Sequence, residues 1–482
     1  MNIKIVLKIL GTVLFWESIL MLPSLVIAIV DNSYEIKSFI ITILLCGIIG
    51  LILKGMKSNE NEMRKREGYA SVALCWLVMS LAGALPFYLS GSLTSYIDAL
   101  FETVSGFTTT GSSILTDIES MPRGLLFWRS FTHWIGGMGV LVFTMALAPL
   151  LGGRSVFLMR AESPGPTFGK LVPKLSESSK ILYIIYAGMT AILIILLIIA
   201  GMPVFDSFIH AFGTAGTGGF SNKALSVGYY NSPWIEWIIT IGMFLFGVNF
   251  TLYYILLIKG DLRTIFKNEE FRLYFGYVIA AILLVFLSVL HKFGYSFSEA
   301  LRHSAFTVSS IVSTTGFATV DFNIWPMFAK SILLTLMIFG ACAGSTGGGV
   351  KSIRILVLFK AIFHEIKHTI HPNSVQTVKV DGKSIDNDTL KGILVFFFAY
   401  VIIIIFATII VSLDNFDFST SFSAVIATIS NIGPGLEVVG PMGNYHGFSN
   451  LSKLILSACM IIGRLEVLPV LVLFSPSIWK KH

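Results

Sequence analysis

Four stretches of the chain share a Thr-Gly or related step at which a short helix would stop. They are FETVSGFTTTGSS at residues 101–113, FDSFIHAFGTAGTGGFS at 205–221, AFTVSSIVSTTGFAT at 305–319 and TSFSAVIATISNIGPGL at 420–436. A helix that ends at glycine leaves main-chain carbonyl oxygens without partners inside the helix. Such oxygens suit a dehydrated cation, so the four stretches predict a ring of loops that binds a cation.

The four stretches align on one shared glycine. The aligned glycines are Gly111, Gly218, Gly316 and Gly433, preceded by Thr110, Thr217, Thr315 and Ile432, and the residues ten earlier are Phe101, Phe208, Phe306 and Ser423. Recurrence at about a hundred residues indicates an internal repeat. One Thr-Gly step alone is commonly a helix-packing contact. Four corresponding copies favour the ring.

The composition is that of a polytopic membrane protein, with 55% hydrophobic and only 13% charged residues. The formal net charge of +7 comes from Lys and Arg that cluster between apolar segments and lack interleaved aromatics, which argues against a nucleic-acid partner. Cys46, Cys75, Cys342 and Cys459 stand singly in apolar segments without a CxxC pattern. Neither a disulfide framework nor a transition-metal cage is indicated.

The apolar segments predict a leading pair of transmembrane helices in residues 1–58, at 5–30 and 39–53. Four membrane–pore–membrane units follow at 68–152, 178–260, 270–365 and 388–476. Each unit has a span, a short segment ending at the glycine loop, and a second span, expected at 125–151, at 234–258, from 328 onward and at 454–474. The short segments of ~10–12 residues cross about half a bilayer, so they are predicted to be re-entrant pore helices.

Irregular backbone inside a membrane is tolerated only where protein buries it or water lines it. The four loops are therefore expected to surround one pseudo-fourfold pore in an all-α membrane fold. Lys and Arg concentrate in the segments between the units and at the end of the chain, whereas few follow the glycine loops. By the positive-inside rule both termini are expected in the cytoplasm, with the glycine loops entering from the opposite side.

Several phrases resemble a known superfamily. They are GGMGVLVF at 136–143, GACAGSTGGGVKSIRILVLFK at 340–360, SNIGPGL at 430–436 and GRLEVLPVLVLF at 463–474. Nearly the whole chain resembles the Trk/Ktr/HKT superfamily of K+ transporters, and the TrkH type more than KtrB. The resemblance implies K+ uptake across a bacterial inner membrane by a homodimer surrounded by lipid. It also implies gating by a cytosolic TrkA-like ring that binds NAD or ATP, with no cofactor on this chain and no enzymatic activity.

The resemblance also implies which residues would supply the filter oxygens. They are Thr109, Thr110 and Gly111; Gly216, Thr217 and Gly218; Thr314, Thr315 and Gly316; Asn431, Ile432 and Gly433. A second glycine is present only in the last unit, as Gly435. Fewer enforced carbonyl layers predict looser discrimination of K+ from Rb+ or Na+ than in a tetrameric K+ channel.

A glycine-rich run is predicted to interrupt the second span of the third unit. Glycine costs ~1 kcal/mol relative to alanine within a helix, so three in succession should break it. The resemblance favours an intramembrane gating loop at 340–350, containing Gly344, Ser345, Thr346, Gly347, Gly348 and Gly349. The alternative is a glycine-rich seam between packed helices.

Arg464 is placed midway along the last span, where a charge usually faces a cavity or a partner. Facing the pore, it would repel entering cations and act as a second part of the gate. Glu466, two residues on, points to another helix face. The alternative for Arg464 is a structural ion pair with an acid elsewhere in the chain.

Two other functions remain open at this point. The sequence HEIKH at residues 364–368 matches the H-E-x-x-H zinc motif of an intramembrane metalloprotease, although it follows a basic helix and lacks a clear third ligand. A secondary transporter, for example of Na+ and K+, would use inverted repeats, whereas the units here share one orientation. The basic segments 351–371 and 155–180 are candidate docking surfaces for a regulatory ring, but positive-inside topology also explains their charge.

Overall fold

The structure is a computed structural model that describes residues 2–56, 65–137, 139, 175–372 and 377–473. Within these residues six helices are long and apolar enough to cross a membrane, or seven spans if one bent helix pair is counted. The only sheet in the described part is a hairpin of β1 (Lys379–Val380) and β2 (Lys383–Ser384). The predicted all-α polytopic membrane fold is confirmed.

Some expected features lie outside the described residues. They are most of the basic loop after the leading pair, the second span of the first unit beyond residue 139, the basic segment 155–174, and the end of the chain from residue 474.

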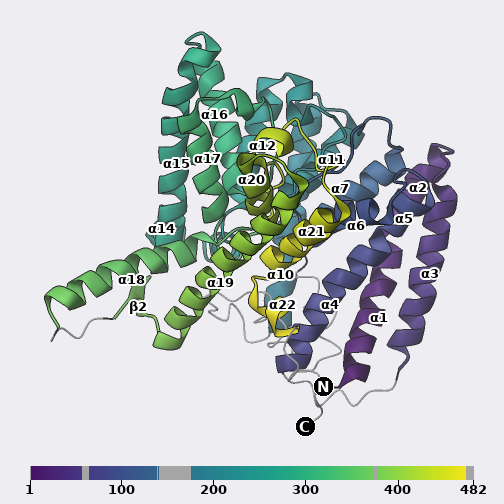
Figure 1. Ribbon diagram of the computed structural model, residues 1–482, viewed down its shortest axis with the longest axis horizontal. Coiled ribbons are helices and arrows are strands. Elements are labelled where there is room, and N and C mark those ends of the chain that lie inside the picture. Colours follow the sequence, from purple (N-terminus) through teal and green to yellow (C-terminus); the bar gives the residue numbers. More distant parts are fainter. Residues whose placement is uncertain (1, 57–64, 138, 140–174, 373–376, 474–482) are drawn as a thin grey trace.

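The leading pair consists of α1 (Ile3–Leu20) with α2 (Leu22–Val30), and α3 (Ile36–Lys54). Glycines bring α1 and α3 close together: a Cβ atom at Gly11 would lie 2.5 Å from Cβ of Leu53, and one at Gly50 would lie 2.7 Å from the main-chain N of Phe15. Small residues permit this approach between membrane helices. The pair lies at one side of the molecule and packs on α4 of the first unit (Figure 1).

In the described residues after the leading pair the chain forms four units, each with one pore helix, defined as the short helix before a glycine loop. The first has α4 (Lys65–Gly83), α5 (Leu85–Leu89), pore helix α6 (Tyr96–Phe107) and α7 (Arg123–Gly137). The second has α10 (Leu175–Ile199), pore helix α11 (Val204–Gly216), η3 (Ser226–Tyr230), α12 (Pro233–Phe246), α13 (Phe250–Lys259) and α14 (Leu262–Lys267). The third has α15 (Glu269–Val289), η4 (Leu290–Phe293), pore helix α16 (Phe297–Val312), η5 (Phe322–Ile324), α17 (Met327–Phe339) and α18 (Ser352–Ile370). The fourth has α19 (Asn387–Val411), η6 (Ser412–Asp414), pore helix α20 (Phe418–Ile429), η7 (Glu437–Val439), α21 (Asn450–Arg464) and α22 (Leu468–Leu473).

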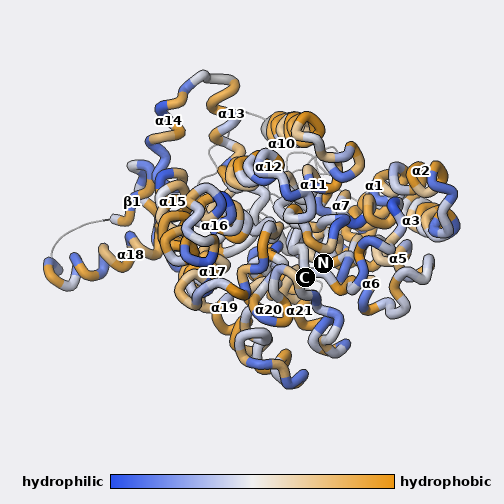
Figure 2. The backbone as a smooth tube through the Cα atoms, turned by 90° about the horizontal axis from the view of Figure 1, so that it is seen from above, coloured by the Kyte–Doolittle hydropathy of each residue, from blue (hydrophilic) through white to orange (hydrophobic). Residues whose placement is uncertain are grey.

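The units follow one another around a common centre, as the view from above shows (Figure 2). The helix after each glycine loop contacts the pore helix of the next unit: α7 contacts α11, α12 contacts α16, α17 contacts α20, and α21 contacts α6 of the first unit. This cycle closes the ring, so the four pore helices surround one axis.

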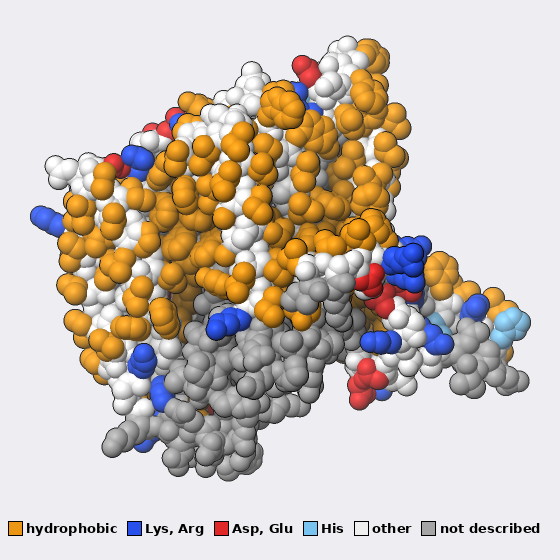
Figure 3. Space-filling view, turned by 180° about the vertical axis from the view of Figure 1, so that it is seen from behind, with side chains coloured by type: hydrophobic (Ala, Val, Ile, Leu, Met, Phe, Trp, Pro, Cys, Tyr) orange, Lys and Arg blue, Asp and Glu red, His pale blue; other side chains and the backbone are white. Residues whose placement is uncertain are grey.

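Hydrophobic side chains cover most of the described part of the face shown in Figure 3, whereas Lys, Arg, Asp and Glu gather mainly toward its upper and lower edges. Large exposed side chains occur along three spans, for example Ile195 of α10, Leu287 of α15 and Phe406 of α19. A water-exposed domain does not carry such an apolar surface, so this band is the lipid-facing surface of the protein.

The second spans of the last three units are broken, and only one of these breaks was expected. Helices α12 and α13 meet at a bend of 93°, so the stretch expected as the span 234–258 is broken. The stretch expected as the span 454–474 is interrupted as well, because α21 ends at Arg464 and α22 begins at Leu468. In the third unit residues 340–351 separate α17 from α18, at the glycine-rich run. We call this stretch the 340–351 segment.

Candidate functional site

The four glycine loops have one backbone conformation. The first loop residue has a positive φ in each copy: 53° at Thr109, 56° at Thr217, 62° at Thr314 and 55° at Asn431. Two residues later φ is positive again: 82° at Gly111, 75° at Gly219, 85° at Gly316 and 99° at Gly433. The residue between donates its N–H to the carbonyl five residues earlier: Thr110 to Ser105, Gly218 to Gly213, Thr315 to Ser310 and Ile432 to Ala427. The loops are therefore four copies of one structure.

This geometry shifts the second loop by one residue relative to the sequence alignment. Gly216 is the last residue of α11, so Thr217, Gly218 and Gly219 occupy the positions that the alignment gave to Gly216, Thr217 and Gly218. The adjacent glycines left two alignments possible, and of the two only Gly219 has the positive φ.

The residue ten positions before the glycine supports the shift. The alignment placed Phe208 with Phe101 and Phe306, but Phe208 is 37% exposed whereas the other two are fully buried. In the corrected register the equivalent residue is Ile209, which is also fully buried. The burial of Ile209 distinguishes the two registers, and it follows from the tertiary packing of the pore helix.

The loops touch one another in a closed ring. A Cβ atom placed on the glycine of each loop would lie too close to a carbonyl oxygen of the next loop. The distances are 2.0 Å from Gly111 to Gly218 O, 2.0 Å from Gly219 to Thr315 O, 2.1 Å from Gly316 to Ile432 O and 2.8 Å from Gly433 to Thr110 O. Each third residue thus lies against the second residue of the next loop. No side chain fits at these contacts, so glycine is required by space as well as by positive φ.

The ring contains main-chain oxygens that no protein donor satisfies. Within the described residues no hydrogen bond reaches the carbonyls of Thr109, Thr110, Gly111, Thr217, Gly218, Gly219, Thr314, Thr315, Gly316, Asn431 and Ile432. Buried carbonyls are nearly always paired, so a cluster of unpaired ones on one axis calls for a partner from outside the protein. Gly433 differs, because its carbonyl accepts hydrogen bonds from the Ser112 and Tyr445 hydroxyls.

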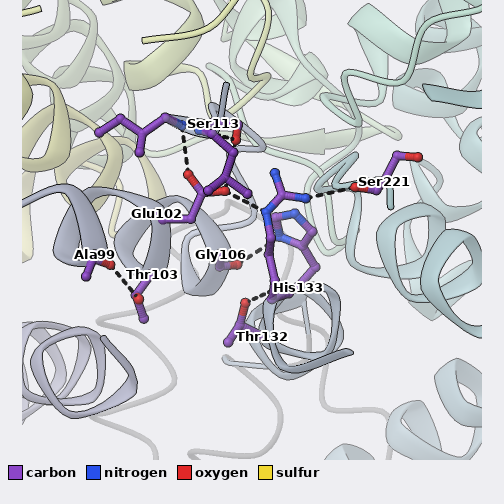
Figure 4. Close-up of polar contacts among 11 residues, drawn as sticks. Ala99, Glu102, Thr103, Gly106, Ser113, Thr132, His133 and Ser221 are labelled. Atoms are coloured by element: carbon purple, nitrogen blue, oxygen red, sulfur yellow. Dashed lines mark hydrogen bonds and ion pairs between the residues drawn. The ribbon is translucent and has the colours of Figure 1, made fainter. Parts of the chain in front are cut away.

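A buried ion pair stands behind the first two loops (Figure 4). Glu102 of α6 lies 2.6 Å from Arg129 of α7, and both side chains are at most 2% exposed. Glu102 also accepts from Ile114 N at 2.8 Å and from Ser113 Oγ at 3.0 Å, while Arg129 donates to Ser221 O at 2.9 Å. These extra hydrogen bonds offset the desolvation of the two charges. The pair thus ties the exit of the first loop to the exit of the second.

Further charged contacts join consecutive units. Glu236 of α12 lies 2.8 Å from Arg302 of α16, and Lys453 of α21 lies 2.7 Å from Asp98 of α6. Sequence reasoning missed these residues and the Glu102–Arg129 pair because the partners are distant along the chain. The available signal was a charged residue inside an otherwise apolar helix.

The 340–351 segment packs against the third and fourth glycine loops. Gly348 N donates to Thr314 Oγ1 at 2.6 Å. A Cβ atom at Gly348 would lie 2.4 Å from Ser430 O, and one at Gly347 would lie 2.9 Å from Ser313 O. Gly347, Gly348 and Gly349 are buried. These glycines therefore allow the 340–351 segment to pack closely against the two loops, in addition to interrupting the helix.

The 340–351 segment also forms hydrogen bonds with the bend between α12 and α13. Cys342 N donates to Gly247 O at 3.0 Å, and Phe250 N donates to Gly344 O at 3.0 Å. Thr346 Oγ1 donates to Phe246 O at 3.2 Å. These bonds use backbone groups that the bend frees. The sequence signal was the Gly-Val-Asn step at 247–249 inside an apolar run, which the sequence analysis did not use.

Arg464 reaches the 340–351 segment from the end of α21. Its guanidinium donates to Thr346 O at 2.9 Å and to Gly136 O of α7 at 2.7 Å. Glu466, which the sequence placed on another face, instead forms an ion pair with Arg354 at the start of α18. The guanidinium therefore connects the third unit to the first through main-chain oxygens.

The HEIKH motif lies near the end of α18, which projects away from the rest of the protein (Figure 1). Glu365 and His368 are exposed, and the rings of His364 and His368 are stacked 6.5 Å apart. In the described part of the chain no group of three or more His, Cys, Asp or Glu side chains is placed to hold a metal ion. The structure gives the protease alternative no support.

Comparisons with known proteins cover the full chain. The family described as "TrkH: Cation transport protein" matches residues 35–481. The chain is 37% identical to the Trk system potassium uptake protein TrkH of Salmonella typhimurium over 486 residues, which cover 100% of both proteins. It is 34% identical to the Trk system potassium uptake protein TrkG of Escherichia coli strain K12, over 99% of both. The crystal structure of the potassium transporter TrkH from Vibrio parahaemolyticus superposes with a TM-score of 0.89 at 31% identity, over 100% of both chains.

Proposed function

The chain belongs to the TrkH family of cation transport proteins, and on this premise we propose that it takes up K+ across a bacterial inner membrane through a gated, K+-selective pore. It is a transporter and not an enzyme. The relatives named as potassium uptake proteins match over 99 to 100% of both chains, which supports the proposal.

One observation carries the proposal: the closed ring of glycine loops presents carbonyl oxygens, most of them on buried residues, to which no donor in the described part of the chain forms a hydrogen bond. Stacked carbonyls can replace the hydration shell of K+, whose size suits oxygen rings held at a fixed radius. The pore helices end at this ring, and the negative ends of their dipoles favour cations over anions there.

The 340–351 segment and Arg464 are proposed to form the gate. The segment is packed against the third and fourth glycine loops, and Arg464 holds it through Thr346. We take the structure as the closed arrangement, in which the segment obstructs the path. Replacement of Gly347, Gly348 and Gly349 by alanine should alter flux without altering the order of ion preference.

Regulation is proposed to come from a cytosolic TrkA-like subunit that binds a nucleotide, NAD or ATP. Helix α18 begins at the gate segment and projects outward, so a partner bound to it could move the segment directly. Two copies of the chain are proposed to form a homodimer. Both termini are proposed to be cytoplasmic, a placement that reaction of cysteines introduced near each terminus with a membrane-impermeant thiol reagent would check.

The decisive experiment is ion uptake in a bacterium that lacks K+ uptake systems. Wild-type protein should restore K+ and Rb+ uptake and growth at low K+. Serine at Gly111, Gly219, Gly316 or Gly433 should abolish or reduce it, since each Cβ would collide with a neighbouring loop. Failure of the wild-type protein to move K+ refutes the proposal. Single-channel currents would distinguish a pore from a secondary transporter that works by alternating access.

A further inference from the structure

The fourth quarter of the glycine ring differs from the other three. Gly111, Gly219 and Gly316 are partly exposed, whereas Gly433 is buried. The contact that closes the ring at Gly433 is also the widest: its Cβ position lies 2.8 Å from the next carbonyl, against 2.0 to 2.1 Å at the other three glycines. The surroundings of Gly433 are therefore not equivalent to those of the other three glycines.

Two hydroxyl groups donate hydrogen bonds to the Gly433 carbonyl oxygen. Tyr445 Oη donates to it at 2.8 Å, and Ser112 Oγ donates to it at 3.1 Å. A carbonyl oxygen has two lone pairs, so both are used by the protein. In the described part of the chain no donor reaches the matching carbonyls of Gly111, Gly219 and Gly316.

Tyr445 is fixed in place by its surroundings. The side chain is 2% exposed, and its ring lies 5.5 Å from that of Phe101 in α6 and 5.7 Å from that of Phe448. Its main-chain N donates to Ser113 O at 2.8 Å. Tyr445 thus lies between the first and fourth units. Its hydrogen bond keeps the Gly433 oxygen directed toward the contact between these two units.

We infer that Tyr445, with Ser112, withholds the Gly433 carbonyl from the ion, so that the outer oxygen ring has three protein ligands and the two rings beneath it have four. This inference rests on the proposed function. Tyr445 is then a specificity-determining residue that acts through Gly433. An ion at the outer level must keep more of its water, and the outer ring therefore selects K+ less strongly.

The consequence is that removal of the hydroxyls should improve the outer site. A Gly433 carbonyl that loses its donors is buried and unsatisfied unless it turns to the axis, where an ion or water can satisfy it. Glycine at this position permits the change in ψ that turns the carbonyl, while the ring of Pro434 fixes the φ on the other side of the same peptide bond and keeps the rotation small. Four oxygens should then hold K+ more tightly and discriminate better against the smaller Na+.

The test is Tyr445→Phe, alone and combined with Ser112→Ala, measured as initial uptake of K+ and Na+ over a range of concentrations in the uptake-deficient bacterium. Phenylalanine keeps the ring contacts and removes only the donor. The matched control is Tyr96→Phe, which deletes a tyrosine hydroxyl at the start of α6 that donates to Leu81 O of α4 at 2.8 Å, a hydrogen bond that involves no glycine loop.

The double variant should lower the half-saturating K+ concentration about fivefold, in line with one hydrogen-bond-sized interaction gained. It should also raise the ratio of K+ to Na+ uptake, and Tyr445→Phe should change both in the same direction by less. Values equal to those of Tyr96→Phe and wild type would overturn the inference, and so would a fall in the K+ to Na+ ratio. Wild-type protein that fails to take up K+ would instead refute the proposed function.

Discussion

Replacement of Arg464 tests whether the 340–351 segment closes the pathway. Its guanidinium bonds Thr346 O of the segment at 2.9 Å and Gly136 O of α7 at 2.7 Å. A charge-assisted hydrogen bond of this kind contributes ~1.5–3 kcal/mol. Since each 1.4 kcal/mol is tenfold, loss of the Thr346 bond should raise the open fraction about 10- to 150-fold, if the closed state dominates before the change.

Two variants separate the tether from the charge. Arg464→Gln removes both, whereas Arg464→Lys keeps the positive charge but lacks the planar fork that spans two carbonyls. A tether predicts increased basal flux in both variants, larger for glutamine. An electrostatic barrier alone predicts an increase only for glutamine. Arg263→Gln, at an exposed position in α14, is the control for removal of an arginine.

The assay is Rb+ tracer flux from proteoliposomes that contain the purified chain without any partner. Wild-type protein and Arg263→Gln should show low basal flux, and the order of preference among K+, Rb+ and Na+ should be the same in all variants. Basal flux at the wild-type level in both Arg464 variants would refute the role assigned to this residue and to the segment it holds.

Three other outcomes follow from the structure. Gly219→Ala should abolish K+ uptake, because the added Cβ would lie 2.0 Å from a carbonyl oxygen of the next loop. Gly188→Ala is the control and should keep uptake, because its Cβ would meet nothing within 4 Å. Equal uptake by the two variants would contradict the corrected register. Glu102→Gln should destabilise the protein by ~3–5 kcal/mol because it leaves a buried arginine unpaired. A melting temperature in detergent that matches wild type would argue against that pair as a support of the loops. Asp417 caps the N-terminus of α20 by accepting hydrogen bonds from the main-chain N and the hydroxyl of Thr420. These bonds hold the pKa of Asp417 below its ordinary value, so the stabilisation that the ionised cap gives is present above the unfolded-state pKa of about 3.9 and is lost as pH falls below it. Asp417→Ala should accordingly cost about 1 kcal/mol at neutral pH and little in acid, measured by thermal unfolding at the two pH values; an equal cost at both would show that the charge is not involved.

Much of the architecture could be predicted from the sequence because it depends on local patterns. Apolar segments of sufficient length indicate the spans, and glycine steps at equivalent positions indicate the loops. The interruption at residues 340–351 follows from three adjacent glycines, which no helix easily accommodates.

The remaining features depend on tertiary contacts that local patterns do not contain. The register of the second loop required the burial of Ile209 and the positive φ of Gly219. The 93° bend before Phe250 is stabilised by bonds to a segment about a hundred residues later in the chain. The role of Tyr445 follows from a hydroxyl that reaches the loop from a later connection, a contact with no sequence signature.

The ion site is tested most directly by locating bound ions in crystals grown with Rb+ or Tl+, from their anomalous scattering. A K+ filter built from the four glycine loops should show ion density on the ring axis, between the carbonyl layers of the loops that contain Thr110, Gly218, Thr315 and Ile432. An axis without ion density, or ions bound only at side-chain carboxylates elsewhere, would contradict it.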